Sequence, residues 1–253
     1  MTRDTQHVLL VLVGGVLIKI VLDGSYLRYV RPWSATPVLV VGVVLVAVAL
    51  VALVRDLRGR SPSTGDHGHD HHPEGRAGPA AWLLVLPVLA LLLVVLPALG
   101  SGALAGFGAR AAPTVATPAD EPLPPGEAPA LGLLDVVSRT SADPHGPVTE
   151  REITVTGFVA PSVATGAGGA DGPDLARLVI SCCAADASAV RLHLADPSGR
   201  LAGVVPGGAE GDRWVTIRGR VVAGTGTPAD GHVPTLSVTA WWPIATPDPV
   251  YEY

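Results

Sequence analysis

The chain has 253 residues, a net charge of −5 and a mean hydropathy of +0.43. Its apolar residues are grouped in blocks, a pattern typical of a membrane protein that excludes a fully soluble chain. Residues 131–253 carry eight basic and thirteen acidic side chains, so the whole net charge of −5 belongs to this part of the chain. This excess argues against a nucleic-acid partner, which calls for a basic face.

Three apolar blocks in residues 1–105 are predicted to be helices that span the lipid bilayer, since a span needs roughly 20 apolar residues. They cover about 8–27, 38–54 and 80–99. The first block contains Lys19 and Asp23, which are four positions apart and share one helix face. We expect an ion pair near the membrane surface. The alternative is a functional pair of ionisable groups inside the span.

A histidine-rich loop, residues 55–79, connects the second and third blocks and holds four of the eight histidines. Its candidate metal ligands are Asp66, His67, His69, Asp70, His71 and His72. Neutral imidazole is the commonest metal ligand in proteins, and zinc accepts nitrogen and oxygen donors. The loop therefore predicts a metal site, with a solvated polar connector as the alternative.

The charges near the membrane predict the topology. With three spans, the N-terminus and the histidine-rich loop lie on one side, next to five arginines, and the C-terminal domain lies on the other, next to three. Because basic residues are enriched on the cytoplasmic side, the loop is predicted to be cytoplasmic and the C-terminal domain extracytoplasmic. An alternative is cleavage after Ala103-Leu104-Ala105, which would release the soluble domain.

A linker rich in Pro, Ala and Gly, residues 106–130, precedes a soluble domain, residues 131–253. Within this domain, five segments alternate between apolar and polar residues, which predicts strands with one buried face. They lie at 153–159, 177–182, 190–194, 214–221 and 236–240. The predicted fold is a membrane-anchored, all-β domain: a small five-stranded barrel of the OB type, after a lead-in helix near 131–137.

Cys182 and Cys183 are the only cysteines in the chain. In a regular strand over 177–182, Cys182 would face the core together with Ile180, and Cys183 would face outward or lie just past the strand end. The two thiols need a bulge or a turn to act together, and the Ala-Ala-Asp-Ala run after them can supply it, with Asp186 capping the turn through its side chain.

Three interpretations of the cysteine pair remain open. The thiols form a vicinal disulfide, or they are small apolar side chains in a strand, or they bind a metal together with Asp186. His193 and His232 are further candidate ligands for such a site. A catalytic thiol is not expected, because no base is identified that would activate it.

The chain resembles the YcgQ-like family of bacterial membrane proteins. The resemblance rests on the three-span half, the histidine-rich loop, the Cys-Cys-Ala-Ala-Asp-Ala run at 182–187, the Trp-Val-Thr-Ile-Arg-Gly run at 214–219 and the ending at 247–253. It implies a multi-pass protein of the bacterial cell membrane that associates with a multispan permease. It also implies a part in metal handling, with zinc as the favoured ion, and it carries over no catalytic residues.

The expected function is that of a non-enzymatic accessory subunit of a permease, which delivers or senses a metal. A membrane-tethered thiol redox protein and a structural adaptor that docks on a membrane partner are the alternatives. The sequence has no P-loop, no dinucleotide-binding fingerprint and no recognisable serine triad. Three spans are too few to enclose an ordinary permeation path, so transport by this chain alone would require a homo-oligomer.

Overall fold

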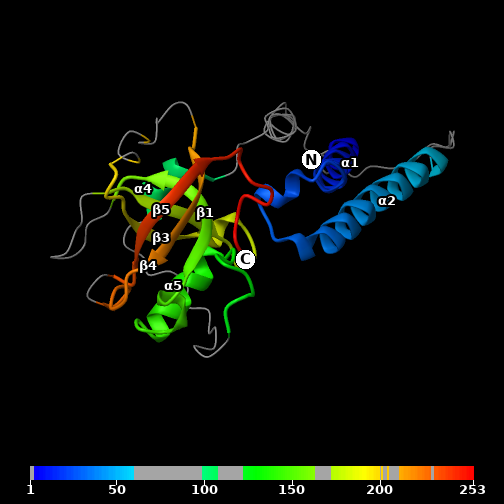
Figure 1. The fold of residues 1–253 in the computed structure, drawn as a ribbon. Helices are drawn as coiled ribbons and strands as arrows, with labels where there is room; N and C mark the ends of the chain where they lie inside the picture. Colours follow the sequence, from blue (N-terminus) through cyan, green and yellow to red (C-terminus); the bar gives the residue numbers. More distant parts are fainter. Residues whose placement is uncertain are drawn as a thin grey trace, which may run out of the picture. The chain divides into compact units, whose positions relative to one another are not determined.

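The computed structural model describes residues 3–59, 99–107, 122–162, 172–199, 201, 204, 211–228 and 231–253. The chain divides into two compact units, Met1–Pro97 and Ala98–Tyr253. Figure 1 shows a helical first unit, drawn in blue and cyan, and a second unit built around a β-barrel.

The first unit contains two long helices, α1 (Arg3–Leu22) and α2 (Ala35–Gly59), joined by the short 3-10 helices Ser25–Arg28 and Pro32–Ser34. Helix α1 ends at Leu22 because Gly24 adopts φ +74°, a left-handed conformation that turns the chain and suits glycine. The first block was predicted to continue to residue 27, so its end is corrected by five residues.

Helix α2 is the clear membrane-span candidate among the described residues. The stretch Pro32–Asp56 is long and apolar enough to cross a bilayer, whereas the apolar part of α1, Gln6–Leu22, is shorter. The prediction of three spans is therefore corrected to one clear candidate within the described part of the chain. The predicted third span, apart from its last residue, and most of the histidine-rich loop, residues 60–79, lie outside the described residues.

The two helices pack through a pair of glycines. A Cβ on Gly14 would lie 2.8 Å from the Gly42 carbonyl oxygen, and a Cβ on Gly42 would lie 3.0 Å from the Gly14 carbonyl oxygen. Small residues allow this close approach of two helix backbones. At the C-terminal end of α1, the Lys19 ammonium is 2.8 Å from the Asp23 carboxylate, which confirms the predicted ion pair.

Five strands form a closed barrel in the order β1-β2-β3-β5-β4 (Figure 1), which confirms the predicted five-stranded barrel. Their bounds are β1 Glu152–Ala160, β2 Asp174–Val179, β3 Ser188–Ala195, β4 Trp214–Val221 and β5 Thr235–Pro243. Strands β3 and β5 are parallel, and the other four pairs are antiparallel.

The barrel core follows the predicted alternation except in β2, where Leu175 and Val179 join the core in place of the predicted Leu178 and Ile180. Ile153, Val155, Leu192 and Ile217 are all buried in one apolar cluster. Helix α5 (Leu133–Ala142) adds side chains such as Leu133, Val136 and Val137 to the same cluster. The lead-in helix therefore exists, but it begins two residues later and ends five residues later than predicted.

A second apolar cluster lies apart from this core and includes Ala176, Leu178 and Ile180 from β2 and the residue after it. Helix α4 (Ser101–Phe107) contributes Leu104 to it, which is 6% exposed. The remaining buried members are Phe158, Ala160, Ala187, Trp214 and Tyr251.

The unit that contains the barrel therefore begins well before the predicted linker. Leu99 donates a backbone hydrogen bond to the Tyr251 hydroxyl, 2.7 Å away, and the Ser101 N–H donates to Asp212, 2.9 Å away. The Ala103-Leu104-Ala105 segment is part of helix α4, whose Leu104 packs into the second apolar cluster.

Candidate metal centre

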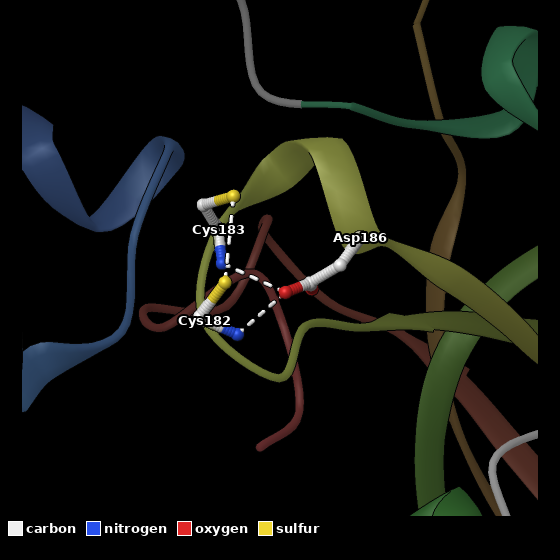
Figure 2. A group of neighbouring side chains, drawn as sticks. All are labelled: Cys182, Cys183 and Asp186. Carbon is white, nitrogen blue, oxygen red and sulfur yellow. Dashed lines mark hydrogen bonds between the residues drawn. The ribbon is translucent and has the colours of Figure 1, made fainter.

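The two cysteines lie in a tight turn that follows β2, and one carboxylate holds that turn. Asp186 Oδ1 accepts the Ser181 N–H at 2.8 Å, and Asp186 Oδ2 accepts the N–H groups of Cys182 at 2.8 Å and Cys183 at 3.3 Å. Asp186 ends the 3-10 helix Ala184–Asp186, whose N-cap is Cys183. Figure 2 shows the hydrogen bonds from Cys182 and Cys183 to Asp186, which confirm the predicted cap.

The turn brings the two thiols together. Their sulfur atoms are 3.6 Å apart; Cys182 is exposed and Cys183 is half-buried, and both are free thiols. The prediction that Cys182 faces the core was wrong, because β2 ends at Val179 and the chain turns before the alternation reaches Cys182. The need for a turn between the thiols was predicted correctly.

The turn also controls the protonation of Cys182. A hydrogen bond to Asp186 is the main cause that raises the pKa of the Cys182 thiol to about 12, and the neighbouring Cys183 adds to the effect. The same hydrogen bond lowers the pKa of the Asp186 carboxyl, with help from the three backbone N–H groups. At neutral pH Cys182 is therefore a protonated thiol beside a carboxylate, and a cation bound there would replace its proton.

The donor atoms fit a tetrahedral ion. One sulfur of each cysteine and one Asp186 oxygen all lie within 4.8 Å of one another. Two thiolates on tetrahedral zinc, with Zn–S bonds of about 2.3 Å, lie roughly 3.8 Å apart, close to the spacing observed here. Sulfur with oxygen donors suits zinc and softer cations better than magnesium or calcium, which prefer oxygen alone.

A vicinal disulfide fits the same geometry less well. The Cα atoms of adjacent residues across a trans peptide are about 3.8 Å apart, whereas disulfide-linked Cα atoms are usually about 4.4–6.8 Å apart. Closing the Cys182–Cys183 ring would therefore strain the backbone and make the bond easily reduced.

His193, a predicted further ligand, is not near the cysteines. In the β2–β3 pair it lies opposite Asp174, whereas Val179, near the cysteine turn, lies opposite Ser188. The five positions from Ser188 to His193 correspond to about 17 Å of strand. The strand register thus places His193 far from the thiols, although the two lie close together in the sequence.

His193 is also buried, with 9% of its surface exposed. Its Nδ1 is 3.1 Å from Asp174 Oδ1, and Arg191 Nη1 is 3.4 Å from Asp174 Oδ2. Sequence analysis missed this buried charged cluster. The only signal was the presence of ionisable residues in strands whose other face is apolar.

The remaining predicted ligands do not join the group. His232, in a left-handed conformation with φ +61°, is not part of the Cys182–Cys183–Asp186 cluster. The six candidate ligands of the histidine-rich loop, Asp66, His67, His69, Asp70, His71 and His72, lie outside the described residues.

Glu252 supports the cysteine turn from the C-terminal segment, and sequence analysis missed it. Its N–H donates to the Leu178 carbonyl at 2.9 Å, and its carbonyl accepts the Ile180 N–H at 3.1 Å, one residue before the turn begins. Its carboxylate accepts the N–H groups of Leu133 and Leu134, both at 2.9 Å, and so caps helix α5. No local pattern links these segments, because more than 100 residues separate Glu252 from α5.

Residues 144–253 match the family described as DUF1980 C-terminal domain. The match covers all five strands and the cysteine turn, and it is consistent with the YcgQ-like resemblance. Neither the curated proteins nor the solved structures include a match to the chain.

Proposed function

We propose that the protein is a membrane-anchored, non-enzymatic accessory subunit of a multispan permease that binds a divalent metal ion, zinc foremost, on its barrel domain. The observation that carries the proposal is the group formed by Cys182, Cys183 and Asp186. Two thiols 3.6 Å apart beside a carboxylate, on an exposed turn, form a donor set suited to zinc.

Other features support the remaining parts of the proposal. Helix α2 can serve as a membrane anchor, and the arginine distribution supports a barrel domain outside the cytoplasm. The closed strand order with the parallel β3–β5 pair supports an OB-type barrel. The histidine-rich loop offers a second place for metal on the opposite side of the membrane.

The test is a calorimetric zinc titration of the detergent-purified, full-length protein with its thiols reduced. We expect saturable binding, and we expect the double variant Cys182→Ser/Cys183→Ser to lose one binding site. Replacing His67, His69, His71 and His72 together by Ala should remove a separate, weaker class of sites, because Gly65 and Gly68 increase the entropy lost when this stretch is ordered around an ion.

Asp196→Asn is a control at a second turn of the barrel domain. Asp196 holds that turn by accepting the N–H groups of Ser198 and Leu201, as Asp186 holds the cysteine turn, but no cysteine lies in it. The control should bind zinc like the natural protein. A double cysteine variant that binds as much zinc as the natural protein would remove the barrel site from the proposal.

A thiol redox function is the second candidate, because the exposed Cys182 is accessible to an oxidant and its sulfur is close to that of Cys183. This function requires an oxidant, which would be a low-molecular-weight disulfide or the disulfide of an oxidoreductase. The oxidant accepts two electrons, both thiols release their protons, and a bond forms between the two sulfur atoms. Mass spectrometry after mild oxidation would then show the loss of two hydrogens from one peptide. A pair that stays reduced would exclude this function.

A further inference from the structure

Within the described part of the chain, the candidate metal site of the barrel has three protein donors, and this number determines how it would hold an ion. Among the residues that the structure describes, the group contains Cys182, Cys183 and Asp186, and no fourth Cys, His, Asp or Glu joins it. Structural zinc sites are closed by four protein ligands, whereas sites that exchange or react keep a position open.

The third donor is itself partly occupied. Asp186 Oδ2 already accepts two backbone N–H groups, and Oδ1 accepts one. A carboxylate has about four lone-pair positions in total, so little acceptor capacity remains for a metal. The ion would therefore be held mainly by the two sulfurs.

The site is also open to solvent. Cys182 and Asp186 are exposed and Cys183 is half-buried. Figure 2 shows the two sulfur atoms and the carboxylate on one short turn, which includes the 3-10 helix Ala184–Asp186. An incoming ligand can therefore reach an ion at this turn without any opening of the fold.

From these observations we infer that the site is a transfer site, which passes a thiophilic ion by direct ligand exchange to a protein acceptor bearing imidazole or thiolate donors. The inference rests on the proposed function. The acceptor's donor occupies the open position first, and the two cysteine sulfurs then leave the ion in turn. Each thiolate that leaves takes up one proton, so the two protons released on loading are taken up again and no electron moves.

The test uses the full-length protein with His67, His69, His71 and His72 replaced by Ala, so that only the barrel site is loaded with Zn²⁺. The loaded protein is mixed with the chromophoric chelator pyridylazoresorcinol in a stopped-flow instrument. If exchange is direct, the observed rate of zinc transfer doubles with each doubling of the chelator concentration. A rate that is independent of the chelator means that the ion must dissociate first, and it overturns the inference while leaving the proposed function intact.

Cobalt provides a second readout that does not depend on rates. In Co²⁺-loaded protein, added imidazole should shift the visible absorption bands, because it enters the open position. Unchanged bands would show a closed coordination shell and would also overturn the inference. If neither ion binds, the proposed function fails first, so the two failures are distinguishable.

Discussion

At the scale of single residues, Asp186 has the largest effect on the candidate site. Its carboxylate holds three successive N–H groups and thereby sets the direction of both thiols. It also keeps Cys182 protonated, because the thiol hydrogen-bonds to the carboxylate and the nearby negative charge disfavours a thiolate. Without a metal, Cys182 is therefore a poor nucleophile at neutral pH, and a bound cation would neutralise the charge of Asp186.

The variant Asp186→Asn should make Cys182 more reactive. Removing the carboxylate charge lowers the pKa of the Cys182 thiol from about 12 toward its ordinary value, so more thiolate is present at pH 8. Alkylation should become roughly tenfold faster or more, because each pKa unit changes the thiolate fraction about tenfold. Iodoacetamide labelling of Cys182, followed by mass spectrometry across a pH series, measures the shift.

The pH series separates this charge effect from simple loosening of the turn. A charge effect moves the midpoint of the reactivity profile to lower pH, whereas loosening raises the rate without moving the midpoint. Asp196→Asn should leave the Cys182 profile unchanged. An unmoved midpoint in Asp186→Asn would contradict the assigned role of the carboxylate.

At the scale of elements, Glu252 joins three segments that are far apart in the sequence. Helix α5 begins after Gly132, which has no side chain to cap it, and Glu252 supplies the missing acceptor. Gly132 allows this approach, since a Cβ there would lie 3.1 Å from a Glu252 carboxylate oxygen. Arg177, from β2, lies 3.6 Å from the same carboxylate.

Glu252→Gln should destabilise the barrel domain by about 1–2 kcal/mol, because one capping oxygen and the charge beside the helix N-terminus are lost. The loss of the Arg177 partner acts in the same direction. Urea unfolding, followed by tryptophan fluorescence, measures the difference. Glu150→Gln, at an exposed glutamate, is the control and should change stability by less than about 0.5 kcal/mol. Equal unfolding midpoints for the two variants would contradict the prediction.

At the scale of the whole molecule, the chain consists of a helical unit and a barrel unit that begins at Ala98. The segment 99–107 is part of the second unit because Leu104 completes its second apolar cluster, next to Phe158 and Trp214. Since the barrel unit has a core of its own, we expect it to fold without the helical unit.

The fragment 98–253 should therefore unfold cooperatively, and the fragment 108–253 should be less stable by about 1.5–3 kcal/mol. The shorter fragment lacks the buried Leu104 side chain, which accounts for this magnitude, and it also lacks the hydrogen bonds of Leu99 and Ser101. Urea titrations of both fragments check this expectation. Equal stability would mean that α4 contributes nothing to the barrel, and a noncooperative transition in 98–253 would mean that the unit is not independent.

The sequence alone was sufficient for the features that local patterns encode. Alternation predicted all five strands, although β2 begins and ends three residues earlier than predicted, at Asp174–Val179. The spacing of Lys19 and Asp23 predicted their ion pair, and the side chain of Asp186 predicted the capped turn at the cysteines. Composition separated the helical unit from the barrel, although the boundary between them was placed too late.

Only the tertiary structure decided which of the remaining residues meet. Strand register carried His193 away from Cys182 and buried it against Asp174, and register depends on pairing rather than on the spacing within one strand. The glycine that ends α1 shortened the first block. The cysteine turn also depends on Glu252, which hydrogen-bonds to the chain just before it. Glu252 lies more than 70 residues away in the sequence, so this contact forms only when the chain folds. The sequence thus determined the elements and the chemistry of the cysteine turn, and the fold decided which donors it brings together.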